Sequence, residues 1–104
     1  MSMKLALASW SFPFCTLPEI AAIAKAVGVP ALDIGVDYRA AVDRHALLSA
    51  PERTGRALRD LDIDMPCFYY RFGQELDERN LAAPENLAAN AEDFKKVVAF
   101  CAAA

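Results

Sequence analysis

The sequence predicts an α/β fold made of three βα units whose strands run parallel. Extended apolar segments alternate with amphipathic helical segments three times along the 104 residues, as in a parallel sheet covered by helices. The dipeptide Pro-Glu begins at Pro18, Pro51 and Pro84, so each copy lies 33 residues after the one before. Proline is common in first turns, but every copy has the same place in its unit, which indicates a repeated structure.

The first unit begins with a strand predicted over Lys4–Phe12. A capping box follows, in which Thr16 accepts a backbone N–H from the residue three places on and Glu19 reaches back. Pro18 lies in the first turn, where no N–H is needed. The predicted helix ends at Gly28, the residue type that most often terminates helices.

The second unit contains the strand around which the chain is organised, predicted over Ala31–Arg39. Leu32, Ile34 and Val36 fall on one face by the two-residue period of a strand, and this face is expected to pack on the helices. Asp33 falls on the other face. A carboxylate in mid-strand is costly to bury unless it is paired or used; the alternative is the exposed face of an ordinary sheet.

A polar connection over Asp37–Leu48 leads to the second helix. We expect this helix to start at a second capping box, Ser49–Glu52, and to end near Leu61. The third strand is predicted over Ile63–Tyr70. Its Pro66 is unfavourable in a fully paired central strand and indicates a sheet edge or a bulge.

The third helix begins near Pro84, without a complete capping box. Its apolar residues recur at steps of four and three, which predicts one stripe facing the core: Leu87, Ala91, Phe94, Val98 and Cys101. No Gly, Asn or Pro follows this helix. We therefore expect residues 1–104 to be a single partial domain that is truncated in the third helix.

Parallel βα units leave two architectures open, a (β/α)8 barrel and a doubly wound sheet. A dinucleotide-binding sheet would have a Gly-rich turn after its first strand, whereas this chain has Ser11–Phe14 there, without glycine. Barrels use roughly 31 residues per unit, close to the observed spacing. We expect the first part of a (β/α)8 TIM barrel.

Charge and hydropathy argue against two classes of partner. The net charge is −3 and no basic stripe is present, so a nucleic-acid interface is not expected. The longest apolar run, Val97–Ala104, has 8 residues and is too short to span a bilayer. Three cysteines without a CxxC pair are typical of free thiols in a reducing cytoplasm.

The candidate binding residues follow from the architecture, because ligands bind at the C-terminal ends of parallel strands. Aromatic rings stack on sugars, and arginine binds phosphate or carboxylate through a fork of N–H groups. The predicted substrate-binding residues are Trp10, Asp33, Asp37, Arg39, Tyr69, Tyr70 and Arg71. Alternatives stay open: Trp10 as a core residue, one of the two tyrosines as packing, and either arginine as a solvated loop residue.

No catalytic or metal-ligating cluster can be built from the sequence. His45 is the only histidine, whereas divalent-metal and proton-transfer sites usually combine histidine with carboxylates. A surface position suits this residue better. We therefore expect no metal to be bound by this chain alone, and its catalytic residues are unknown.

Three segments resemble the N-terminal third of the sugar phosphate isomerase/epimerase family. They are Ser9–Phe12 at the end of the first strand, the helix and strand over Ile20–Ile34, and Phe94–Ala102 in the third helix. The resemblance implies a xylose isomerase-like TIM barrel. Asp33 stands where the family has an acidic residue, usually glutamate, and Pro30 and Ala31 interrupt the glycine that usually precedes it.

The resemblance also implies a cofactor and a division of labour. In that family a divalent metal (Mn, Mg, Co or Zn) is held by Glu, Asp and His residues of later strands, and two glutamates move the proton. Those positions are absent from this chain. Only pocket wall carries over, namely Trp10, Asp33 and the segment Tyr69–Arg71.

The leading hypothesis is therefore the N-terminal portion of a metal-dependent sugar or sugar-phosphate isomerase or epimerase, inactive on its own, with a small carbohydrate as substrate. A second hypothesis is a metal-dependent hydrolase or lyase on the same barrel, endonuclease-like or a polyol dehydratase. A third is a non-enzymatic α/β module that self-associates through open sheet edges. Glu, Asp and His at the ends of later strands would separate the first two.

Overall fold

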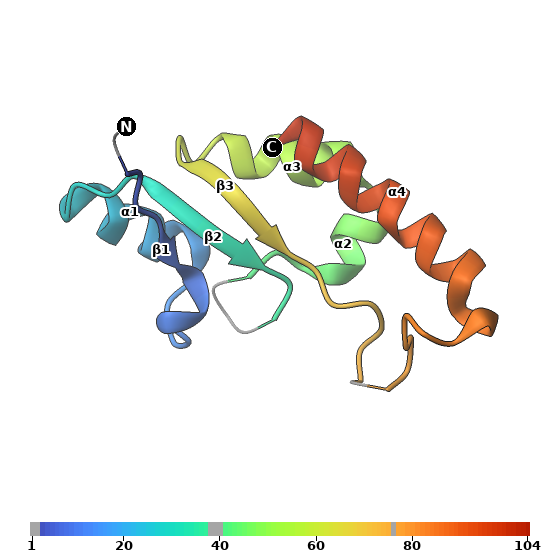
Figure 1. The fold of residues 1–104 in the computed structure, drawn as a ribbon. Coiled ribbons are helices and arrows are strands. Elements are labelled where there is room, and N and C mark those ends of the chain that lie inside the picture. The colour runs from blue at the N-terminus through green and yellow to red at the C-terminus, as the bar shows by residue number, and fades with distance from the viewer. Residues whose placement is uncertain (1–2, 38–40, 76) are drawn as a thin grey trace.

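A computed structural model describes residues 3–37, 41–75 and 77–104 of the chain. Three strands and four α-helices alternate along these residues, with two short 3-10 helices between them (Figure 1). The elements in chain order are β1 (Leu7–Ala8), η1 (Ser9–Ser11), α1 (Leu17–Ala26), β2 (Ala31–Gly35), α2 (Arg44–Ser49), α3 (Pro51–Arg59), β3 (Asp64–Tyr69), η2 (Pro84–Asn86) and α4 (Leu87–Ala103).

The sheet is parallel with the strand order β1-β2-β3, which confirms the predicted α/β class with parallel strands. Leu7 pairs with Leu32, and Ile34 pairs with Phe68. The register of β2 and β3 shifts between Ala31 and Asp33. Pro66 lies at this irregularity, as its missing N–H predicts.

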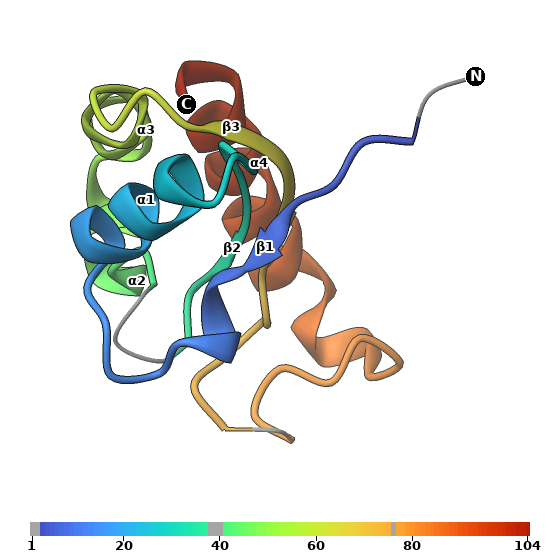
Figure 2. The same cartoon turned by 90° about the vertical axis from the view of Figure 1, so that its left-hand side faces the viewer.

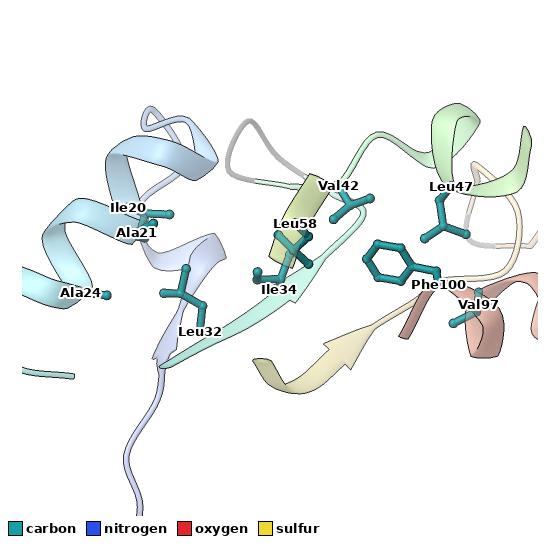
Figure 3. Close-up of a cluster of buried hydrophobic side chains, with 10 residues drawn as sticks. All are labelled: Ile20, Ala21, Ala24, Leu32, Ile34, Val42, Leu47, Leu58, Val97 and Phe100. Atoms are coloured by element: carbon teal, nitrogen blue, oxygen red, sulfur yellow. The ribbon is translucent and has the colours of Figure 1, made fainter. Parts of the chain in front are cut away.

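One face of the sheet carries the hydrophobic core. Leu32 and Ile34 of β2 are buried together with residues of all four described α-helices, as Figure 3 shows. Figure 2 shows α1, α2 and α3 on the same side of β2. Because side chains alternate along a strand, Asp33 points to the opposite, open face, as predicted.

The predicted capping box of α1 is confirmed. The Thr16 N–H donates to Glu19 Oε2 and the Glu19 N–H donates to Thr16 Oγ1, both at 3.4 Å. At the other end Gly28 has a φ of 77°. The N–H of Gly28 donates to the Lys25 carbonyl and that of Val29 to the Ala24 carbonyl, the paired bonds of a Schellman motif.

The second capping box is wrong, because the predicted polar connection contains a helix. Ser49 is the last residue of α2, and Asp43 caps that helix by accepting the Ala46 N–H at 2.7 Å. The N-cap of α3 is Ala50, which has no side-chain cap. The six residues of α2 are too few to show a helical period.

The first two strands are shorter than predicted. β1 has only two residues, because Ser9–Ser11 turn into a 3-10 helix in which the Phe12 N–H donates to the Ser9 carbonyl at 3.1 Å. β2 ends at Gly35, whose carbonyl accepts the Val42 N–H at 2.9 Å. The third strand lies within one residue of its predicted bounds at each end.

The predicted inward stripe of α4 is also wrong. Leu87, Phe94 and Val98 are 71%, 57% and 51% exposed, whereas Val97 and Phe100 are buried. The Phe100 ring packs on the Phe68 ring with 4.7 Å between centroids. Apolar residues occupy two faces of this helix, so periodicity alone could not tell which face packs on β3.

The backbones of α3 and α4 approach each other closely at Gly55. A Cβ atom at this buried position would lie 2.4 Å from the Phe100 carbonyl oxygen and 2.8 Å from Ala103 Cβ. Only glycine fits there. Across the described residues, no helix has both the length and the apolar character needed to cross a membrane.

We predict that Gly55→Ala lowers the free energy of unfolding by about 1–3 kcal/mol, because the added methyl group forces α3 away from α4. In an ordinary helix the same change would stabilise by about 1 kcal/mol. Urea unfolding followed by circular dichroism measures the effect. Ala57→Gly, at an exposed position of α3, is the control for helix propensity. A Gly55→Ala chain more stable than the parent would contradict the close approach.

Candidate functional site

An open cavity of about 470 Å³ lies at the C-terminal end of β3, where this architecture is expected to hold its ligand. We call it the β3-end cavity. Three of its lining residues are predicted site residues, in the consecutive run from Tyr69 to Arg71. The lining consists of Tyr69, Tyr70, Arg71, Phe72, Arg79, Asn80 and Leu81.

Two guanidinium groups converge on one carboxylate beside this cavity. Arg71 Nη2 donates to Asp37 Oδ1 at 3.2 Å and to the Gln74 carbonyl at 2.6 Å. Arg44 Nη2 lies 3.8 Å from the same Asp37 oxygen, and Arg44 Nη1 donates to the Arg71 carbonyl. The three charged side chains therefore have a net charge of about +1.

Two nitrogen atoms of this group are buried and have no hydrogen-bond acceptor within the described part of the chain. They are Arg44 Nη2 and Arg71 Nε. A buried guanidinium N–H without an acceptor is costly. Both atoms are closed to solvent, so these two N–H groups do not themselves offer a binding site to an anion in solution.

We call Arg44 and Arg71 the arginine pair. Tyr70 faces the helices and links this pair to α4. The Arg44 guanidinium carbon lies 5.1 Å from the centre of its ring, and Phe72 packs edge-on at 5.1 Å. The hydroxyl donates to Asp93 Oδ2 at 3.5 Å. Burial raises the pKa of Tyr70, and the charge of Asp93 acts in the same direction while Arg44 opposes it.

The loop before α4 is held down on that helix by Arg79. Its Nη1 lies 3.2 Å from Asn90 Oδ1 and 3.5 Å from Asp93 Oδ2. Asn90 Nδ2 donates back to the Arg79 carbonyl at 3.2 Å. Because Asn90 is buried, these bonds satisfy a polar group that would otherwise oppose the packing, and they set one wall of the β3-end cavity.

The open face of the sheet has an aromatic pair. The rings of Trp10 and Tyr69 lie 6.4 Å apart at 58°, and their side chains are 43% and 51% exposed. Gly35 lies beneath Tyr69, since a Cβ there would be 3.2 Å from the Tyr69 carbonyl oxygen and 3.3 Å from its ring. Asp33 lies on this face too, two residues before Gly35.

The predicted site residues thus form two groups rather than one. Asp37, Tyr70 and Arg71 come together around Arg44, and Trp10 contacts Tyr69 on the open face. Only one of the two adjacent tyrosines points to the open face, as strand alternation requires. Arg39 lies outside the described residues.

Four residues of the site were missed by sequence reasoning: Arg44, Arg79, Asn90 and Asp93. Arg44 lies in α2, within the segment for which the sequence predicts a polar connection. Asn90 and Asp93 are three residues apart, on the side of α4 that also buries Val97. The helical spacing that places Asn90 and Asp93 on the same side of α4 as Val97 could have identified them as residues facing the rest of the chain.

The donor set for a divalent metal is lacking. Within the described residues, no group of three or more His, Cys, Asp or Glu side chains is arranged to hold an ion. His45 is exposed on α2, where its Nε2 lies 3.4 Å from Ser49 Oγ. The metal that the family resemblance implies therefore does not fit the residues that the structure describes.

Comparisons with protein-family models, with curated proteins and with solved structures found no match to this chain. The fold and site alone define the class. It is an α/β chain with a parallel sheet, and at the C-terminal edge of that sheet lies a cavity lined by aromatic and arginine side chains.

We predict that the Tyr70 phenol titrates above the usual value of about 10 and that Asp93→Asn lowers its pKa. Above pH 10 the unfolded chain releases this proton first, so folding stability falls as the pH rises through the Tyr70 pKa of the folded chain. Ultraviolet difference spectroscopy of phenolate measures the titration. Tyr70→Phe identifies the step, and Tyr69→Phe is the control. A Tyr70 step unmoved by Asp93→Asn would contradict the contact.

We also predict that this chain alone binds no Mn²⁺ with a dissociation constant in the micromolar range, because its carboxylates and single histidine do not converge. Isothermal titration calorimetry, with EDTA-treated protein, tests this. One site per chain with micromolar affinity would show that the donor set has been misjudged.

Proposed function

We propose that this chain provides part of the substrate-binding wall of a sugar or sugar-phosphate isomerase or epimerase. The observation that carries the proposal is the β3-end cavity, where three aromatic rings and two arginines line one open depression at the C-terminal end of a parallel strand. This is the edge at which parallel α/β folds bind their ligands.

The aromatic side chains of the cavity are suited to binding a carbohydrate. Sugar rings have apolar C–H faces that stack on aromatic rings, and the phenol of a tyrosine still hydrogen-bonds to hydroxyl groups. Tyr69 both lines the cavity and contacts Trp10 on the open face. A sugar bound at this edge would extend from the cavity towards the aromatic pair.

The arginine pair supports a phosphorylated substrate. Arg71 lines the cavity with a side chain that is 29% exposed, and Asp37 lies within ion-pair distance of both Arg71 and Arg44. Charge-assisted bonds from guanidinium to phosphate are among the stronger hydrogen bonds in proteins. The phosphate would lie beside Arg71, with the sugar over Tyr69.

The residues described here bind and orient; they do not perform the chemistry. In the proposed reaction a proton moves next to the sugar carbonyl, and the divalent metal (Mn, Mg, Co or Zn) that the resemblance implies has no ligand set among the described residues. A reducing, cytoplasmic setting suits the three free cysteines.

We predict that D-ribulose 5-phosphate binds the chain and changes the fluorescence of Trp10, the only tryptophan. Arg71→Gln should weaken binding about tenfold or more, since a charge-assisted bond contributes about 1.5–3 kcal/mol. Tyr69→Ala should weaken both this ligand and unphosphorylated D-ribulose. Arg53→Gln, at an exposed position of α3, is the matched control.

Inorganic phosphate and D-ribulose serve as separate probes in the same titration, with NMR chemical shifts as the second readout. Binding of phosphate alone would leave an anion site without a sugar site and would argue against the proposal. Equal effects of Arg71→Gln and Arg53→Gln would show that the arginine pair takes no part.

A further inference from the structure

An apolar stripe runs along an exposed side of α4, about a quarter turn around the helix from the face that packs on β3. Its largest members, Leu87, Phe94 and Val98, are 71%, 57% and 51% exposed, and the smaller Ala91 and Cys101 are exposed as well. We call these five residues the α4 stripe. Figure 1 shows α4 along one side of the molecule.

The spacing of the α4 stripe indicates what kind of partner covers it. Successive members are four, three, four and three residues apart, which is the alternation of a and d positions in a heptad repeat. This narrow seam is typical of a helix that packs lengthwise on one other helix. The seam borders the buried side of α4, and Cys101 at its end lies close to Cys67 of β3.

We propose that α4 packs antiparallel on α4 of a second copy of this chain, in a dimer with two-fold symmetry. In an antiparallel pair, a positions of one helix face d positions of the other. This register places Phe94 opposite Ala91 of the second copy and Leu87 opposite Val98. The largest side chain therefore meets the smallest of the seam, so the stripe is complementary to itself, as a two-fold interface requires.

The parallel arrangement fits less well. With the two helices in register, Phe94 would meet Phe94 and Ala91 would meet Ala91, so bulky and empty layers would alternate. Packing of both kinds is unfavourable. The helix dipoles also oppose each other favourably only in the antiparallel arrangement.

Charges at the edge of the seam are compatible with the antiparallel pair. Lys95 flanks the stripe and already pairs with Glu92 of its own helix, at 2.9 Å. The antiparallel register brings Lys95 near Ala88 of the second copy, and so no like charges meet. The net charge of −3 per chain adds only weak long-range repulsion at physiological salt.

The size of the interface sets the expected affinity. α4 has 17 residues and is about 25 Å long, so one helix pair buries less surface than a standard interface. We therefore expect a dimer with a micromolar dissociation constant. Sedimentation velocity of the 104-residue chain between about 1 and 200 μM should show a concentration-dependent shift from monomer to dimer.

Two substitutions within the stripe test its role. Val98→Lys places a charge opposite Leu87 of the second copy, and Phe94→Gln removes the largest side chain; each should raise the dissociation constant at least tenfold. Val27→Lys, at a 60% exposed position after α1, is the control. Circular dichroism establishes that each variant keeps its helices. A monomer at all concentrations, or a dimer unaffected by both changes, would overturn the proposal.

Cysteine cross-linking tests the orientation. In a background with Cys15, Cys67 and Cys101 changed to serine, Leu87→Cys and Val98→Cys are made as separate proteins. Copper-phenanthroline oxidation of their mixture should give the mixed disulfide dimer, and oxidation of Leu87→Cys alone should give little. Efficient self-linking of Leu87→Cys would mean a parallel pair and would overturn the proposal. If no disulfide dimer forms from any of these proteins, the α4 stripe is covered by another protein's helix or by further chain. That result would overturn the proposal as well.

Discussion

The contact of the Phe100 ring with Phe68 determines which residues of α4 line the site and which remain exposed. It selects which side of α4 packs on β3, and Gly55 lets α3 come close to the backbone of the same helix at Phe100 and Ala103. With Phe100 buried, Asn90 and Asp93 must point towards the loop and towards Tyr70. The same rotation leaves the α4 stripe outside. One aromatic contact therefore sets both the wall of the β3-end cavity and the exposed seam.

The cavity also depends on a bulge in the sheet. The register shift before Cys67 restores an alternation in which Phe68 and Tyr70 face the helices and Tyr69 faces the open side. Without the extra residue the two tyrosines would exchange faces. Tyr70 would then lose Arg44 and Asp93, and Tyr69 would lose Trp10. Pro66, which cannot donate to the ladder, is thus placed where the site needs an interruption.

The features that the sequence predicted correctly are mostly ones that depend on neighbours along the chain, although the local box at Ser49 is wrong because α2 occupies that segment. The box at Thr16, the stop at Gly28 and the parity of Leu32 and Ile34 are local, and the structure has all three. The face of α4 and the partners of Asp37 are not local, because they depend on residues far apart in sequence. Asp37 could be identified as a strand-end carboxylate, but nothing in the sequence indicated that it would be shared by Arg44 and Arg71.

The charges of the arginine pair and of Asp37 determine what kind of ligand the site favours. Asp37 lies between Arg44 and Arg71, and the Glu78 carboxylate also acts on Arg44. Partial burial makes each N–H without an acceptor more costly than it would be in water. These charged groups lie at the edge where parallel strands end, next to exposed aromatic rings. That combination supports the proposed anionic, sugar-like ligand, and it lies at the open edge of the sheet rather than in the core.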